Sequence, residues 1–154
     1  MKKHLAVILI SLISFNSAIA AAVPKEKALT LHEVSTKVTN AWARPSAKGH
    51  NSSVYMIIAN EDLTEQDELV AVECDKAEKT ELHNNVNVNG IFEMVPIDNL
   101  VIPAGRTVYF QPGGLHVMLM NLKETLMEGQ SFNITLTFKK FGKVSTSVKI
   151  GNQL

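Results

Sequence analysis

Residues 131–138 decide the fold class, and they read Ser-Phe-Asn-Ile-Thr-Leu-Thr-Phe. Hydrophobic side chains take every second position from Phe132 to Phe138, and polar side chains take the positions between them. Successive side chains of a β-strand point to opposite faces, so this alternation predicts a strand with one buried and one exposed face. No segment of the chain shows a sustained helical period. The sequence therefore indicates a domain built from half-buried strands.

Further short β-type runs lie on both sides of this stretch, and turn residues separate them. Glycine supplies a positive φ and proline presets φ, so segments such as Asn89-Gly90 and Pro112-Gly113-Gly114 are predicted turns. The runs cover residues 38–44, 53–59, 68–74, 80–83, 91–96, 107–111, 116–120 and 143–150, beside the strand at 131–139. Many short strands at close spacing are typical of an antiparallel β-sandwich or barrel.

The composition narrows the classes of function. The chain has 154 residues, 45% of them hydrophobic, which is enough for one domain with a real core. Fifteen basic side chains balance fifteen acidic ones, whereas a nucleic-acid-binding protein normally has a basic excess, so we expect no nucleic-acid partner. Cys74 is the only cysteine, which excludes an internal disulfide framework and Cys-rich zinc modules.

The first twenty residues have the features of a secretory leader. Lys2 and Lys3 precede an apolar run over residues 5–15, and Ala18-Ile19-Ala20 provides the small residues of a cleavage site. The run is too short for a spanning helix, so we predict a cleaved signal peptide at 1–20 rather than a membrane anchor. An N-terminal arm at 21–37 and a domain at 38–150 follow. We expect a periplasmic protein that is not embedded in the membrane.

Histidine and methionine recur in a pattern that suggests a metal site. His116 and Met118 are two residues apart on a predicted strand, so their side chains share a face. Asn89-Gly90 is the favoured two-residue hairpin turn, and a turn centred there places Met94 opposite Asn85. His83 then lies diagonally from Met94 on the same face, within reach of a long side chain.

Two imidazoles and two thioethers would form an uncharged, partly soft set of ligands. Such a set suits Cu(I) and does little for zinc, magnesium or calcium. Taken singly, each residue has a simpler explanation, because a methionine in a strand usually fills the core and a histidine usually forms hydrogen bonds. Met120 shares the face of Met118, and we expect it to serve packing instead of binding metal.

The spacing as a whole carries more information. Ten residues separate His83 from Met94, twenty-one separate Met94 from His116, and one separates His116 from Met118. This pattern is similar to the motif of the periplasmic PCuAC-type copper chaperones. The resemblance covers about residues 38–150 and includes the segments Ala41–Arg44, Glu81–His83, Ile102–Gly105, Pro112–Met120 and Leu126–Phe138.

The resemblance implies a cupredoxin-like, immunoglobulin-like β-sandwich that is not an enzyme. It implies one Cu(I) per chain, held by His83, Met94, His116 and Met118. The implied partner is a copper-accepting protein, either a cytochrome c oxidase subunit or an assembly factor of that oxidase. We expect a monomer. The chain departs from some family members at its end, Gly151-Asn152-Gln153-Leu154, which lacks a tail rich in histidine and methionine.

Three other functions stay open at this point. A periplasmic copper-scavenging or tolerance protein would use the same ligands without a dedicated recipient. A blue-copper electron carrier would need a Cys thiolate beside two histidines, and Cys74 has no histidine at a typical nearby spacing. A metal-free β-sandwich interaction module would need none of these ligands. We expect His32, His50 and Cys74 to lie outside any copper site.

Overall fold

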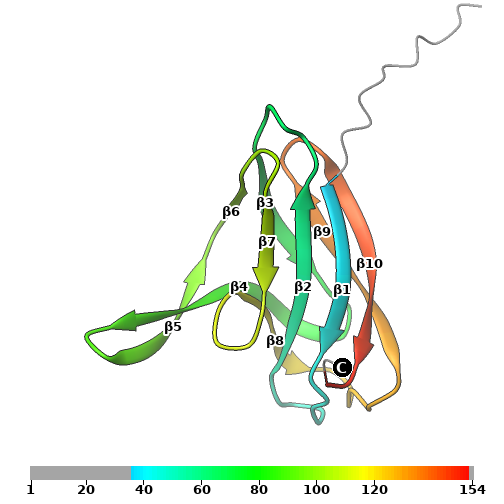
Figure 1. The fold of residues 1–154 in the computed structure, drawn as a ribbon. Coiled ribbons are helices and arrows are strands. Elements are labelled where there is room, and N and C mark those ends of the chain that lie inside the picture. The colour runs from blue at the N-terminus through cyan, green and yellow to red at the C-terminus, as the bar shows by residue number, and fades with distance from the viewer. Residues whose placement is uncertain (1–35, 153–154) are drawn as a thin grey trace, which may run out of the picture. The chain divides into compact units, whose positions relative to one another are not determined.

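The computed structural model describes residues 36–152, and strands dominate them (Figure 1). In chain order the strands are β1 Thr36–Ala43, β2 Ser52–Asn60, β3 Asp67–Glu73, β4 Ala77–Val88, β5 Ile91–Ile97, β6 Leu100–Ile102, β7 Thr107–Phe110, β8 His116–Leu122, β9 Ser131–Phe138 and β10 Gly142–Ile150. The all-β prediction is confirmed. The predicted signal peptide and nearly all of the predicted arm lie outside the described residues. None of the described segments forms a helix with the length and apolarity that a membrane span requires.

The strands belong to one sheet that runs in the order β5-β4-β8-β2-β1-β10-β9-β3-β6, with β7 paired to β2. Every pair is antiparallel except β1 and β10, which run parallel through Trp42–Lys149 and Ala43–Ile150. The predicted antiparallel sandwich therefore includes one parallel pair. Alternation along a strand identifies its buried face but not its neighbours, and β1 and β10 come from opposite ends of the domain.

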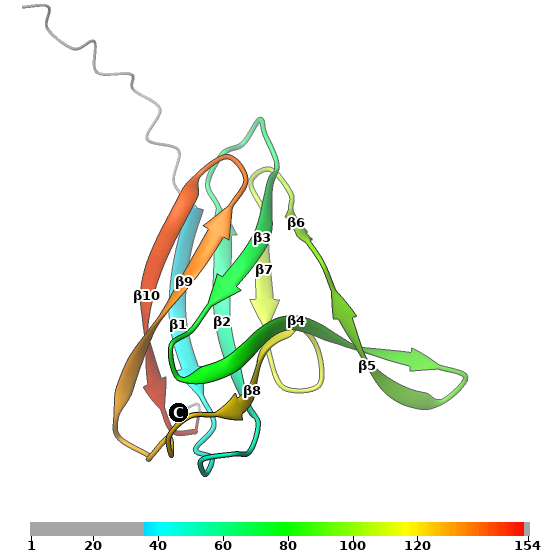
Figure 2. The ribbon, with the colours of Figure 1, turned by 180° about the vertical axis from the view of Figure 1, so that it is seen from behind.

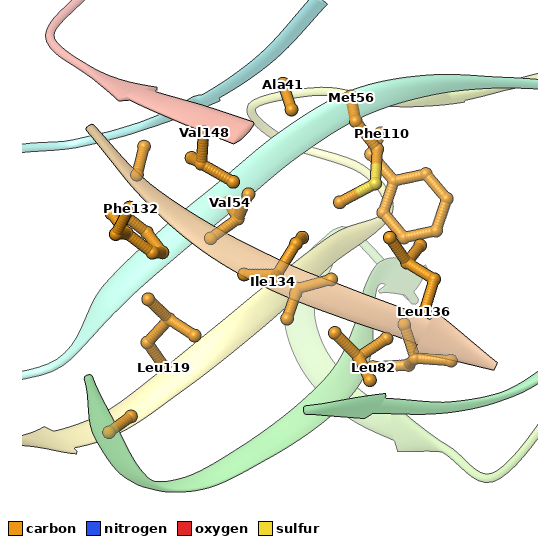
Figure 3. Close-up of a cluster of buried hydrophobic side chains, with 14 of the residues drawn as sticks. Ala41, Val54, Met56, Leu82, Phe110, Leu119, Phe132, Ile134, Leu136 and Val148 are labelled. Atoms are coloured by element: carbon orange, nitrogen blue, oxygen red, sulfur yellow. The ribbon is translucent and has the colours of Figure 1, made fainter. Parts of the chain in front are cut away.

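The core lies between the two halves of this folded sheet. Side chains of β9 meet those of β2, β8 and β4 in one cluster, where Ile134 and Leu136 are fully buried (Figure 3). The predicted buried face of residues 131–138 is thus confirmed. On β8 the core receives Val117 and Leu119, so the alternating residues of that strand point to the outer face of the sheet.

A long hairpin, β4–β5, extends away from the other strands (Figures 1 and 2). Its turn is Asn89-Gly90, where both residues have positive φ, 54° and 88°, as the favoured hairpin turn requires. The predicted pairing of Met94 with Asn85 is confirmed by the register. β5 forms one edge of the sheet, and many of its side chains are exposed.

Two strands differ from the sequence prediction. β4 runs to Val88, five residues beyond the predicted end at His83, through Asn84, Asn85 and Asn87. Asparagine is depleted in strands, so local preference does not indicate this extension, and pairing with β5 stabilises it. β6 has three residues and pairs with β3 at the other edge, and so short a run carries little alternation to detect.

Candidate metal centre

His83 and His116 are direct partners across the β4–β8 pair. Residues opposite each other in an antiparallel pair have their side chains on the same face. Their ring centroids lie 5.8 Å apart, and the residues are only 9% and 3% exposed. An imidazole nitrogen binds a metal ion at about 2 Å, so two rings on one ion have centroids roughly 5–6 Å apart. The two histidines are therefore spaced as two ligands of one ion would be.

Each histidine uses one ring nitrogen for a hydrogen bond within the protein. Nε2 of His83 lies 2.9 Å from Oε2 of Glu81, and Nδ1 of His116 lies 2.9 Å from the carbonyl oxygen of Gly114. The Lys79 ammonium pairs with the other carboxylate oxygen of Glu81. The contact with Lys79, followed by the contact with His83, lowers the pKa of the Glu81 carboxyl below its ordinary value. Glu81 is therefore ionised near neutral pH.

The second nitrogen of each ring has no partner. Within residues 36–152, His83 Nδ1 and His116 Nε2 are buried and form no hydrogen bond, a condition shared only with the Thr137 hydroxyl. A buried polar atom without a partner costs about 1–3 kcal/mol, and such atoms are rare in folded proteins. Both unpartnered nitrogens belong to the two rings that face each other. The residues present therefore fit a metal ion that would satisfy both atoms.

Met118 lies beside this pair. It follows His116 by two residues on β8 and is opposite Glu81 on β4 and Ser53 on β2, so it shares the outer face with both histidines. Its side chain is half-buried. Within the described part of the chain, no group of three or more His, Cys, Asp or Glu residues could hold a metal ion. The thioether of Met118 is a further soft donor on the face that bears the two histidines.

Met94 lies on the same face but farther out, on the hairpin. It is opposite Asn85, two positions along β4 from His83, and it is 49% exposed. The structure thus brings His83, His116 and Met118 together on adjacent strands and leaves Met94 at the exposed edge. Met120 is also on the outer face, opposite Lys79, and is half-buried. It does not belong to the hydrophobic core.

The aromatic and acidic neighbours of the site were not predicted from the sequence. The buried Tyr55 ring lies 6.3 Å from the His116 ring and 4.5 Å from Trp42, and the Arg44 guanidinium lies over it at 5.7 Å. Glu81 could have been found, because it is two residues before His83 and a strand puts both on one face. Tyr55 could not, since its position depends on the pairing of β2 with β8.

The remaining candidates lie apart from this site or outside the described residues. His50 is exposed in the segment before β2, and His32 precedes the described residues. Cys74 packs against the hydrophobic core, and burial is the main cause that raises the pKa of its thiol above the ordinary value.

Residues 36–150 match the sequence model of a family described as "Putative lipoprotein LpqE-like". The chain belongs to this LpqE-like family, which is the PCuAC-type family. Within it, the chain is 31% identical over 125 residues to the uncharacterised protein RP573 of Rickettsia prowazekii (strain Madrid E). That match covers 78% of this chain and 68% of the relative.

Solved structures of PCuAC domains have the same fold. The apo PCuAC domain from PmoF1 is 30% identical and superposes with a TM-score of 0.62, over 77% of this chain and 94% of that domain. The solution structure of CuI-DR1885 from Deinococcus radiodurans is 27% identical, with a TM-score of 0.56 over 76% of this chain and 80% of that protein. The predicted PCuAC-type β-sandwich is thus confirmed.

Proposed function

We propose that this chain binds one Cu(I) ion through His83, Met94, His116 and Met118 and delivers it to a copper-accepting protein. The observation that carries the proposal is the pair of buried, unpartnered nitrogens on facing imidazoles, His83 Nδ1 and His116 Nε2. Neutral imidazole and thioether donors suit a soft monovalent ion. The relative DR1885 was solved as CuI-DR1885, which supports this choice of metal.

The position of Met94 supports release of the ion as well as binding. Three of the proposed ligands lie on neighbouring strands, whereas Met94 is half-exposed on the edge strand of the projecting hairpin. A donor from the recipient can replace this thioether first, because it approaches from the open side. Transfer then proceeds by exchange of one ligand after another, with no enzymatic step.

The proposed recipient is a cytochrome c oxidase subunit or an assembly factor of that oxidase, and the proposed compartment is the periplasm. The description of the family as a lipoprotein supports export of the chain. Copper scavenging without a recipient is the second candidate, because it would use the same ligands. Mixing the Cu(I)-loaded chain with the copper-binding domain of an oxidase subunit separates the two candidates. Delivery predicts transfer to that domain, and scavenging predicts retention.

A blue-copper electron carrier is disfavoured. Such a centre needs a cysteine thiolate together with two histidines. Burial raises the pKa of the Cys74 thiol, which opposes formation of the thiolate, and the residue packs against the core while the histidines occupy the outer face. Absence of a blue colour on addition of Cu(II) is the expected result.

The stoichiometry of binding is the first test. Titration of residues 21–154 with Cu(I) under anaerobic conditions should saturate at one ion per chain by mass spectrometry, because the proposed site is a single set of two imidazoles and two thioethers. Trp42 is the only tryptophan and stacks on Tyr55 beside His116, so its fluorescence should change up to the same end point. A second tight equivalent would mean that His32, His50, Cys74 or Met120 forms a site of its own.

The choice of metal is the second test. The chain should bind Cu(I) far more tightly than Zn(II), since thioether sulfur adds little to zinc affinity and carboxylates do not join the set. Competition between the two ions, followed by native mass spectrometry, measures this ratio. Equal affinities would contradict the assignment of methionine ligands and would implicate Glu81 as a ligand instead.

A further inference from the structure

The two histidines of the site are held by opposite ring nitrogens. A carboxylate that is ionised only accepts hydrogen bonds, so the contact of 2.9 Å with Glu81 requires a proton on Nε2 of His83. A backbone carbonyl also only accepts, so the contact of 2.9 Å with Gly114 requires a proton on Nδ1 of His116. In a neutral imidazole the other nitrogen then carries a free lone pair. These are the two atoms that lie buried without a partner.

Glu81 is fixed in a way that suits this task. One carboxylate oxygen accepts from His83, and the other pairs with the Lys79 ammonium. Lys79, Glu81 and His83 alternate along β4, so all three point to the outer face. Only 26% of the Glu81 side chain is exposed, compared with 66% for Lys79. The carboxylate is thereby held against the ring from one side and anchored from the other.

The chemistry of the carboxylate argues against a role as a copper ligand. Carboxylate is a hard, charged donor, and it suits magnesium, calcium or manganese better than Cu(I). Both of its oxygens are already paired, and the charge of Lys79 balances its own. A histidine that binds metal through one ring nitrogen commonly donates the N–H of its other ring nitrogen to such a group, which fixes the ring and makes the metal-binding nitrogen more basic.

We propose that Glu81 is a positioning residue that fixes His83 with its proton on Nε2, so that Cu(I) binds Nδ1 of His83 and Nε2 of His116. This inference rests on the proposed copper site, and it adds the atoms that bind and the group that presents one of them. Here a side-chain carboxylate on β4 and a loop carbonyl before β8 serve the two rings.

Nitrogen-15 spectra of the histidine rings in the apo protein test the hydrogen bonds without copper. At mildly alkaline pH, wild type should show protected N–H protons on Nε2 of His83 and Nδ1 of His116. Glu81→Ala should lose the His83 signal and keep the His116 signal. Glu81→Gln, which retains an acceptor oxygen, should restore the His83 signal at least in part. An unchanged His83 signal in Glu81→Ala would overturn the role of Glu81.

Addition of Cu(I) alone then tests the binding atoms. The expected result is a change in the nitrogen-15 chemical shifts of Nδ1 of His83 and Nε2 of His116. The protons on the other nitrogen of each ring should be retained. Loss of the Nε2 proton of His83 on binding would overturn this inference but leave the copper site intact, whereas no uptake of Cu(I) would overturn the proposed function itself.

Affinity measurements complete the test with a matched control. Glu81→Ala should weaken Cu(I) binding roughly tenfold, the lower end of the effect that outer partners of metal ligands have. Glu124→Ala removes another lysine–glutamate pair, Lys76–Glu124 at 2.6 Å, and should leave both affinity and ring signals unchanged. Equal losses in the two variants would indicate a general effect of surface charge and would overturn the proposal.

Discussion

A chain in which leucine replaces His116 should lose high-affinity Cu(I) binding and keep its fold. The substitution removes one of the two imidazole donors and leaves Nδ1 of His83 facing an apolar side chain. Loss of a group that only orients a metal ligand weakens binding by about 10–100-fold. Loss of the ligand itself should therefore weaken Cu(I) binding by more than about 100-fold. Competition with a Cu(I) chelator of known affinity measures this change.

The fold should survive because two effects of the substitution oppose each other. The bond from Nδ1 to the Gly114 carbonyl is lost, but the buried and unpartnered Nε2 disappears as well. Each effect is about 1–3 kcal/mol, so the free energy of unfolding of the apo chain should change by less than about 2 kcal/mol. Thermal unfolding without copper tests this part of the prediction.

Stability in the presence of copper gives a second, independent measurement. Free Cu(I) at one hundred times the dissociation constant should stabilise the wild type by about 2.7 kcal/mol and should not stabilise the His116→Leu variant. His50→Leu is the matched control, because His50 is exposed and lies outside the site. Wild-type affinity in His116→Leu would show that the facing histidines are not the ligands.

Much of the fold could be predicted from alternation and turn chemistry. The alternation over residues 131–138 identified the core face of β9, and Asn89-Gly90 identified the turn and register of the β4–β5 hairpin. The parallel pairing of β1 with β10 could not be predicted, because it joins the two ends of the domain. Neighbours in a sheet depend on the packing of all strands together, which no single stretch encodes.

The same distinction between local sequence and long-range strand pairing applies to the candidate site. The shared face of His116 and Met118 and the pairing of Met94 with Asn85 follow from local geometry, and both are confirmed. The direct opposition of His83 and His116 needs the pairing of β4 with β8, strands that are separated in the chain by β5, β6 and β7. From the sequence, only the resemblance to the PCuAC-type family implied that His83 and His116 belong to one site.

The burial of His83 and His116 could not be predicted from the sequence either. A strand face that bears histidine, methionine, glutamate and lysine has the composition of a solvent-exposed face, yet His83 and His116 are almost fully covered. The ring of Tyr55, on the neighbouring strand β2, lies against His116 and accounts for part of this cover. Burial of a polar face is a property of the assembled sheet.

The choice between two neighbouring methionines is the sharpest test of the ligand assignment. A strand rises roughly 3.3 Å per residue, so the Met118 backbone lies roughly 7 Å from that of His116 and the Met120 backbone lies roughly 13 Å away. Met120 also faces Lys79, whereas Met118 faces Glu81, the residue that contacts His83. Met118 is therefore within reach of an ion held by the two histidines, and Met120 is not.

Replacing Met118 with leucine should weaken Cu(I) binding on the order of 100-fold, which corresponds to two steps of about 1.4 kcal/mol each. Leucine has a similar volume, so the free energy of unfolding should change by less than about 1.5 kcal/mol. X-ray absorption at the copper edge should count two sulfur neighbours in wild type and one in Met118→Leu. Met120→Leu, the matched control on the same strand and face, should retain two sulfurs and nearly full affinity. If Met120→Leu loses a sulfur and Met118→Leu does not, copper lies farther along β8 than the facing histidines imply.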